Sequence, residues 1–102
     1  MGFILIYVTH ENEDSARKIV DHLVSKKFIA GGNIFPISSI YWWKGKIEDI
    51  SEYVSILKTK SENWEKVKNE VIKIHPYEVP AIIKFCVSAN SEYEAWINDE
   101  SR

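Results

Sequence analysis

The chain begins with a short, uninterrupted apolar run over residues 3–8, FILIYV. A run of this length that is rich in β-branched and aromatic residues is typical of a central strand covered on both faces. A helix is predicted next, because Asn12 can serve as an N-cap and Lys26 and Lys27 suit a last turn. Between them, apolar residues recur at helical spacing: Ala16, Ile19, Val20, Leu23 and Val24.

The pattern becomes extended from Ile29 onward. The segment IAGGNIFPISSIYWW contains Pro36, which cannot donate to a central ladder, so we expect a kinked or bulged strand at the edge of a sheet. Lys44 and Gly45 are compatible with a type I turn followed by a G1 bulge, after which the chain returns as a strand over residues 46–58. The two strands form a predicted hairpin.

A second helix, a strand and a short terminal helix are predicted in the remaining sequence. The second helix should end at His75, because Pro76 disfavours helical geometry in the residue before it. Pro80 is tolerated as the first residue of the strand PAIIKFCV, and Asn90 is a possible cap for the last helix. The apolar stripe of the second helix consists of Trp64, Val67, Val71 and Ile72.

The resulting order, βαββαβα, is that of the ferredoxin-like α+β sandwich, in which helices cover one face of a four-stranded antiparallel sheet. A two-layer α+β fold with other connections is the competing arrangement. Right-handed crossovers and short loops favour the first. No internal repeat or linker divides the 102 residues, so a single domain over residues 1–102 is predicted.

The predicted hairpin is longer than the helices that should cover it. From Asn33 to Trp43 an extended chain spans about 36 Å, whereas a helix over residues 13–27 is about 22 Å long. Tyr41, Trp42 and Trp43 therefore lie beyond the helices, and the two indoles point to opposite faces. An exposed aromatic patch normally marks an interface, so we expect another molecule to cover it.

Composition limits the functional classes. With 45% hydrophobic and 27% charged residues the chain is of ordinary globular type, and no segment is apolar for long enough to cross a membrane. No signal peptide is recognisable and Cys86 has no partner for an intrachain disulfide, so a cytoplasmic location is expected. A net charge of -2 and the lack of an RNP1-like segment argue against nucleic-acid binding.

The sequence contains no grouping typical of an enzyme, such as a nucleophile with its base, HExxH or a phosphate-binding glycine loop. A binding site is the alternative to an enzyme active site. In the predicted strand over residues 46–58, alternation places four charged residues on one face: Lys46, Glu48, Glu52 and Lys58. It is either a solvated face with cross-strand ion pairs or part of a cleft between subunits. In the second case, these groups would bind a small ligand or cation together with Tyr77 and Glu78.

Three segments carry a resemblance to a known family: YWWKGKIED, the KT before the second helix, and HPYEVPAI. Through them the chain resembles the CutA family of divalent-cation tolerance proteins, which are related in fold to PII signalling proteins. The resemblance covers essentially the whole chain. It implies a non-enzymatic homotrimer in which each long hairpin extends a neighbour's sheet and covers the indoles, with a role in tolerance of copper and perhaps PII-like signalling. The alternatives are a regulatory protein that binds a small molecule in the cleft without a metal role, or an uncharacterised enzyme.

The same resemblance implies a metal ligand. His75 matches the histidine of the family's HPY motif, which is associated with copper, although a histidine at a helix end also has a purely structural use. Gly31 stands where the family usually has its copper-linked cysteine, so the thiolate is missing. No obligatory cofactor is expected. Cys86 is predicted to be a buried apolar residue, and His10 and His22 to be surface or capping residues.

Overall fold

The computed structural model describes residues 2–102 and confirms the predicted order of elements. A short 3-10 turn, η1 (Ser61–Asn63), precedes the second helix. The strands are β1 (Phe3–His10), β2 (Gly31–Trp43), β3 (Lys46–Thr59) and β4 (Ile82–Val87). The helices are α1 (Glu13–Ser25), α2 (Trp64–Ile74) and α3 (Ser91–Glu100).

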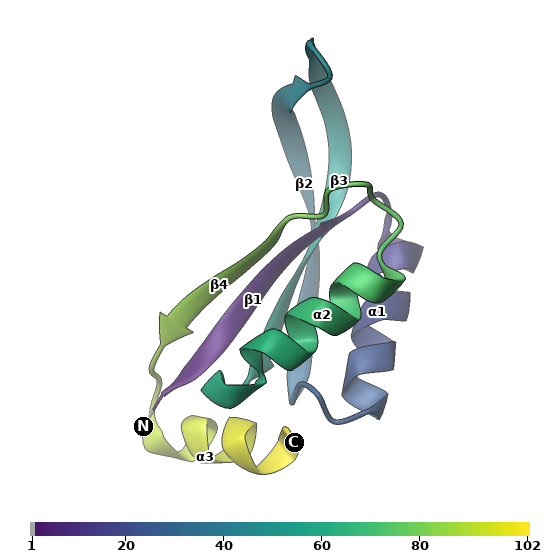
Figure 1. The fold of residues 1–102 in the computed structure, drawn as a ribbon. Helices are drawn as coiled ribbons and strands as arrows, with labels where there is room; N and C mark the ends of the chain where they lie inside the picture. The colour runs from purple at the N-terminus through teal and green to yellow at the C-terminus, as the bar shows by residue number, and fades with distance from the viewer. Residues whose placement is uncertain (1) are drawn as a thin grey trace.

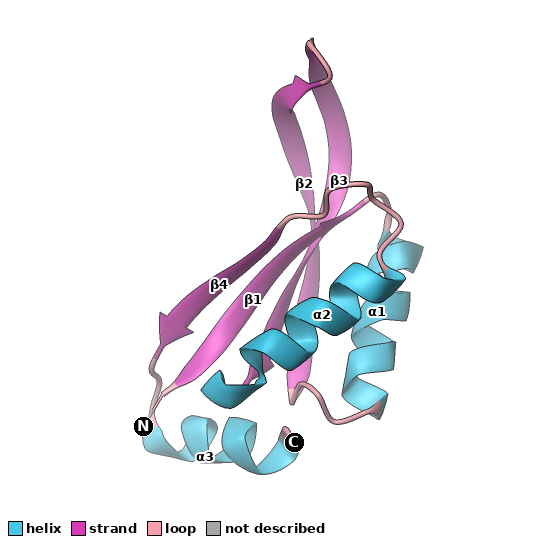
Figure 2. Ribbon diagram, viewed as in Figure 1, coloured by secondary structure: helices cyan, strands magenta, loops and turns pink. Residues whose placement is uncertain are grey.

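The four strands form one sheet in the order β2-β3-β1-β4, with each neighbouring pair antiparallel. Helices α1 and α2 lie on one face of this sheet, and α3 packs across one end of it (Figures 1 and 2). This is the ferredoxin-like α+β arrangement that the sequence predicts. β2 is an edge strand, as Pro36 requires.

The core lies between the helices and the inward-facing residues of β1. Asn12 caps α1 as predicted, because its side chain accepts a 2.8 Å hydrogen bond from the Ser15 N–H. The helices are held on the sheet mainly by apolar contacts, since full burial of one aliphatic side chain contributes about 1.5–3 kcal/mol. The buried cluster contains Ile4, Ile6, Val8, Ile19, Val20, Leu23, Ile29, Leu57, Val67 and Val71.

The turn between β2 and β3 differs from the prediction. Trp43 pairs directly with Lys46, so the loop has only two residues, Lys44 and Gly45, and no bulge. Both have positive φ, 50° and 79°, which is the signature of a type I′ turn. This turn is favoured because its twist matches the right-handed twist of the two strands, whereas a type I turn would splay them.

The start of β4 and the buried stripe of α2 also differ from the prediction. β4 begins at Ile82 and not at Pro80, so the proline belongs to the loop that follows α2. Ile72 is half exposed although the predicted stripe includes it, because α2 turns only Val67 and Val71 fully into the core.

The hairpin of β2 and β3 projects well beyond the helices (Figure 1). The predicted overhang is therefore confirmed, and it stretches the chain to 44 Å along its longest axis against 23 and 21 Å along the others. Trp42 is 72% exposed and shares its face with Ile40 and Ile47, which are also exposed. Trp43 points to the opposite face, where it is 37% exposed.

The sheet face without helices is also apolar. Leu5, Tyr7 and Ile56 form a shallow hollow with Phe85 and Val87 on this side. Phe85 is half exposed although it is a large hydrophobic residue. A face of this composition resembles one half of a packed interface.

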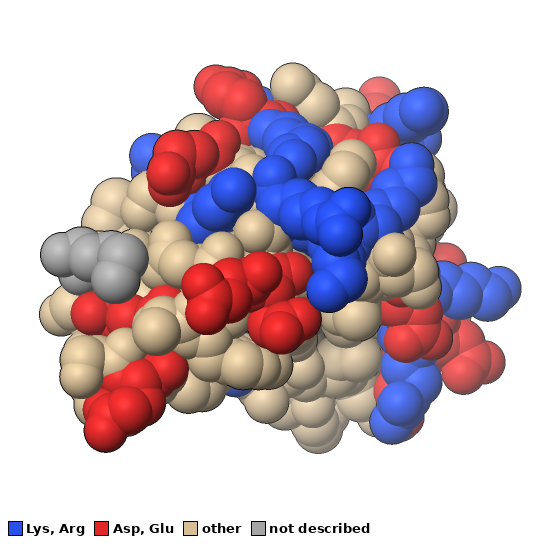
Figure 3. Space-filling view, turned by 90° about the horizontal axis from the view of Figure 1, so that it is seen from below, with Lys and Arg blue, Asp and Glu red and all other residues tan. Residues whose placement is uncertain are grey.

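Charge is mixed on the end of the molecule that Figure 3 shows, where groups of lysine and arginine side chains are bordered by carboxylates. Lys26 pairs with Glu70 and Lys27 with Glu100, each at 3.3 Å. The face therefore carries no continuous basic field. Within residues 2–102, no helix has the length and hydropathy needed to span a bilayer.

Candidate functional site beneath the hairpin

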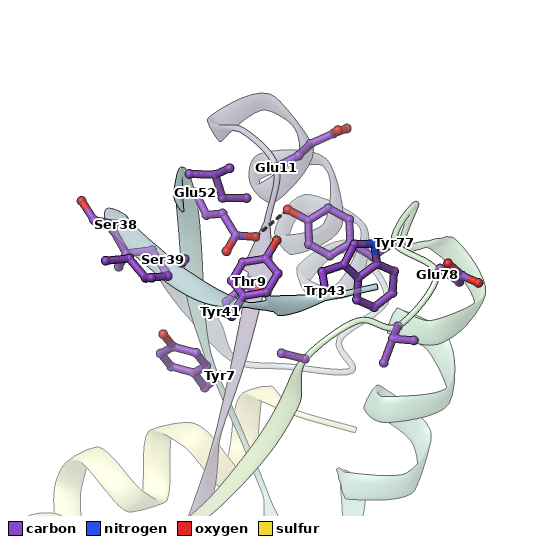
Figure 4. Close-up of a pocket in the computed structure, with 15 residues that line it drawn as sticks. Tyr7, Thr9, Glu11, Ser38, Ser39, Tyr41, Trp43, Glu52, Tyr77 and Glu78 are labelled. Atoms are coloured by element: carbon purple, nitrogen blue, oxygen red, sulfur yellow. Dashed lines mark hydrogen bonds between the residues drawn. The ribbon is translucent and has the colours of Figure 1, made fainter. Parts of the chain in front are cut away.

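A hollow of about 920 Å³ lies on the helix-free face, between the hairpin and the loop that joins α2 to β4 (Figure 4). Its volume falls in the range typical of sites for small molecules. Strand alternation places the side chains that enter it, since the odd-numbered residues of β2 and the even-numbered residues of β3 face away from the helices. The side chains that define its chemistry are Tyr7, Tyr41, Trp43, Glu52, Tyr77 and Glu78.

Glu52 is the most buried charged group of the hollow, with 4% of its surface exposed. The Tyr77 hydroxyl donates a 2.6 Å hydrogen bond to Glu52 Oε2, drawn as a dashed line in Figure 4. The other oxygen, Oε1, is open to the solvent of the hollow and accepts no hydrogen bond from the described residues, and none of their lysines or arginines forms an ion pair with it. A buried carboxylate without a cation is unusual, because burial of an unpaired charge is costly.

The two phenols beside Glu52 are held in their protonated form. Burial raises the pKa of Tyr77, and the hydrogen bond to Glu52 and its negative charge raise it further. The pKa of Tyr41 is also raised, first by burial and then by the charges of Glu52 and Glu48. Both hydroxyls therefore remain hydrogen-bond donors at neutral pH.

His75 fixes the position of this loop. Its Nε2–H donates to the Thr9 carbonyl at 2.7 Å, and its Nδ1 accepts from the Tyr77 backbone N–H at 3.1 Å. The carbonyl can only accept and the amide can only donate, so the ring is a neutral Nε2–H tautomer. Both nitrogens are thus occupied by backbone groups, and metal binding at either would require one of these bonds to break.

His10 is fully buried, so its prediction as a surface or capping residue is wrong. Its ring stacks on His75 with centroids 5.4 Å apart, and its Nε2 is hydrogen-bonded to Ser55 Oγ at 2.8 Å. Burial is the main cause that lowers its pKa from 6.5 to about 4, and electrostatic repulsion between the two stacked imidazoles is a smaller one. Its alternation with Ile6 and Val8 could have revealed this inward position.

His22 and Cys86 lie away from the hollow. His22 is a partly exposed residue that pairs with Glu70 at 2.5 Å, in agreement with the prediction of a surface residue. Cys86 is exposed, so its prediction as a buried residue is wrong. The reason is that β4 is an edge strand, and the helix layer leaves its residues exposed or only partly buried.

The residues present do not fit a copper site within one protomer. Gly31 pairs with Lys58, which pairs with Leu5, whereas His75 contacts Thr9. Leu5 and Thr9 are separated by about 13 Å along β1, so the family's cysteine position and His75 are far apart in one chain. No group of three metal-ligating side chains occurs among residues 2–102.

Only part of the predicted polar face comes together in the hollow. Glu52, Tyr77 and Glu78 do, and they are joined by Tyr41 and Trp43, which the sequence assigns to an interface. Glu78 also pairs with Lys44 of the hairpin turn at 3.3 Å, a contact that the sequence does not reveal.

The other members of that face lie elsewhere. Lys58 is directed toward α3, where its Nζ is 5.7 Å from the centre of the Tyr93 ring. Lys46 and Glu48 lie on the projecting hairpin and are not part of the hollow. In the strand register they stand opposite Trp43 and Tyr41.

The sheet order, the projecting hairpin and the hollow beneath it define a PII-like α+β protein. A solved structure named PII-like protein CutA, from Nostoc sp. PCC 7120, covers 100% of this chain and 98% of its own with a TM-score of 0.91 and 25% identity. The sequence model of the CutA1 divalent ion tolerance protein matches residues 4–100. The chain therefore belongs to the CutA1 family.

Several relatives are similar along nearly their whole length. The divalent-cation tolerance protein CutA of Pyrococcus horikoshii is 39% identical over 97% of this chain and 98% of its own. The corresponding protein of Thermotoga maritima is 41% identical over 94% of this chain and 96% of its own. The crystal structure of CutA1 from Oryza sativa has a TM-score of 0.95 at 31% identity, covering 100% of this chain and 95% of its own.

Proposed function

We propose that this protein is a non-enzymatic, homotrimeric binding protein that takes part in the cellular response to divalent metal ions, with the hollow beneath the hairpin as its ligand site. Relatives named for divalent-cation tolerance support the biological role. The observation that carries the binding role is Glu52, a buried carboxylate with one free oxygen at a hollow of ligand size.

The uncovered apolar surface supports a homotrimer. Trp42, Ile40 and Ile47 are exposed on one side of the hairpin, and Phe85 and Ile83 are exposed on the helix-free face. The edge of β2 also carries unpaired backbone groups, which a neighbouring sheet would satisfy. A neighbour's hairpin along this edge would make the hollow a cleft between subunits.

The absence of a catalytic role is inferred from access and hydrogen bonding. His10 and Ser55 have the geometry of a base and a nucleophile, but both are fully buried and no substrate could reach them. His75 is occupied by backbone groups at both nitrogens. The described side chains of the hollow therefore suit binding better than covalent chemistry.

Copper at His75 is the other candidate. The family resemblance implies it, but the occupied ring nitrogens and the glycine at position 31 favour a ligand in the hollow over chelation of copper by this chain. The proposed location is the cytoplasm, where a free cysteine is stable. Relatives include a chloroplastic form from Oryza sativa and a periplasmic one from Archaeoglobus fulgidus, so cell fractionation is the direct check.

Sedimentation equilibrium followed by calorimetric titration tests this proposal. We expect three times the mass of one chain, and we expect metal-free wild type and His75→Ala to give the same heat on titration with copper(II). A monomer would overturn the homotrimer. Saturable copper binding that disappears in His75→Ala would replace the ligand hollow with a direct metal site.

A further inference from the structure

The walls of the hollow carry negative charge but no positive charge. Three carboxylates, those of Glu11, Glu52 and Glu78, are among its lining residues. None of the described residues that line it is a lysine, arginine or histidine. Lys44 at the rim offsets the charge of Glu78, and the two remaining carboxylates give the hollow a net negative potential.

Glu52 in particular lacks a counter-charge. It is 4% exposed, and the Tyr77 hydroxyl satisfies only one of its two oxygens. In proteins such buried carboxylates are normally paired, because desolvation disfavours a lone charge. A positively charged group entering the hollow would supply what the described residues of the chain do not.

Aromatic rings form the second component of the site, and they also favour cations. Tyr7, Tyr41, Trp43 and Tyr77 line the hollow, and the faces of such rings carry partial negative charge.

The chain itself gives an example of this preference at the rim. Lys44 Nζ lies 5.4 Å from the centre of the Trp43 ring and 3.3 Å from Glu78 Oε2. An ammonium group thus already uses a ring and a carboxylate at the exposed mouth, while Glu52 inside remains unpaired.

The kind of cation follows from the remaining walls. A bare divalent metal ion requires several oxygen ligands around one point, and the described carboxylates form no such cluster. Ile37, Ile50 and Val79 instead give the hollow apolar surface. We propose that the hollow binds a small organic ammonium ion, with its positive nitrogen against Glu52 and its alkyl groups against Tyr41 and Trp43.

This inference rests on the proposed role of the hollow as a ligand site, and it is tested with choline and its uncharged isostere 3,3-dimethylbutan-1-ol. The readout is the indole N–H signal of Trp43 in nitrogen-labelled protein, with Trp64 and Trp96 as internal references outside the hollow. We expect choline to shift the Trp43 signal saturably. The isostere should bind at least about tenfold more weakly, because it lacks the charge.

Glu52→Gln should weaken choline binding by about tenfold or more while keeping an acceptor for the Tyr77 hydroxyl. Glu62→Gln is the matched control, since it removes the same charge from an exposed residue of η1 and should leave binding unchanged. Equal binding of choline and the isostere, or unchanged choline binding in Glu52→Gln, would overturn the ammonium assignment but leave the ligand site intact. A Trp43 signal that neither compound shifts would also overturn the ammonium assignment, whereas the proposed function is tested separately by sedimentation and by the copper titration.

Discussion

The Tyr77 hydroxyl donates a 2.6 Å hydrogen bond to Oε2 of Glu52, which ties the loop after α2 to the middle of β3. His75 holds the other end of the same tyrosine by accepting its backbone N–H. Three residues from two distant segments thus form one unit that shapes the inner wall of the hollow.

Removing this hydroxyl should destabilise the protein. Tyr77→Phe leaves the buried carboxylate of Glu52 without a hydrogen bond from the described residues, and we expect a loss of about 1–3 kcal/mol in the free energy of unfolding. Urea denaturation at fixed protein concentration measures it. Tyr53→Phe is the control, because no side-chain hydrogen bond of the Tyr53 hydroxyl occurs in the described structure. Equal losses in the two variants would contradict the role of the Tyr77–Glu52 bond.

Stability should depend on pH through His10. Its pKa is 6.5 in an unfolded chain and about 4 in the fold, so between these values the unfolded state binds a proton that the native state does not. Lower pH therefore favours unfolding, with a loss of about 3 kcal/mol as the pH falls from above 6.5 to 4.

Urea denaturation of wild type and His10→Gln between pH 4 and 8 isolates this contribution. Carboxylates titrate in both proteins, so the difference between the two curves reports His10 alone. Parallel curves would mean that His10 does not titrate differently in the native and unfolded states.

The two neighbouring glycines should respond differently to an added methyl group. A Cβ on Gly32 would lie 3.2 Å from Val20 Cγ1 and 3.3 Å from Leu57 Cδ2, so Gly32→Ala should cost about 1–3 kcal/mol. A Cβ on Gly31 would meet only Trp96, at an ordinary 3.6 Å, so Gly31→Ala should change stability by less than about 1 kcal/mol. Thermal or urea unfolding of both variants checks the ranking, and the reverse order would contradict the packing described.

A cysteine at position 31 should increase the affinity of the protein for copper. Gly31→Cys fits sterically and adds a thiolate ligand, so we expect it to bind copper more tightly than wild type in a calorimetric titration. Because Gly31 and His75 are far apart in one protomer, the double variant with His75→Ala shows whether a neighbouring subunit completes the site. Affinity equal to that of wild type would mean that no further ligand approaches position 31.

The tip of the hairpin should determine assembly. In the proposed homotrimer a neighbouring subunit would cover both indoles, so Trp42→Ala and Trp43→Ala should each weaken self-association by about 2–4 kcal/mol per interface, as truncation of a buried aromatic residue commonly does. Sedimentation at several concentrations measures the dissociation constant. Ile72→Ala removes a half-exposed residue of α2 and serves as control. Unchanged association in both tryptophan variants would show that the tip stays in solvent.

Much of the fold was predictable because it follows from periodicity. The alternation of a strand places Trp42 and Trp43 on opposite faces, and the same rule places Glu52 on the helix-free face. Parity gives the face of a residue but not its position along the strand. Lys58 shares the parity of Glu52, yet six residues separate them by about 20 Å, so it never reaches the hollow.

The details that the sequence did not reveal depend on distant segments. Glu52 and Tyr77 meet only because the loop after α2 crosses the end of the sheet, and no local pattern reports that path. His10 was missed because β1 continues two residues beyond its apolar run, so that a polar side chain occupies an inward position. The positive φ of Lys44 arises from the twist of the paired strands and not from a preference of lysine.

The strand register also sets an order of events during folding. Trp43 pairs with Lys46 across the turn, so β2 and β3 can form together by closing a very short loop. Phe3 pairs with Val87, near the other end of the sequence. Because this pairing closes the longest loop, the docking of β4 on β1 costs the most chain entropy. We expect the hairpin to form early and β4 to dock last. In that interval β1 is an open edge, and a nascent chain is then most vulnerable to pairing with the wrong partner.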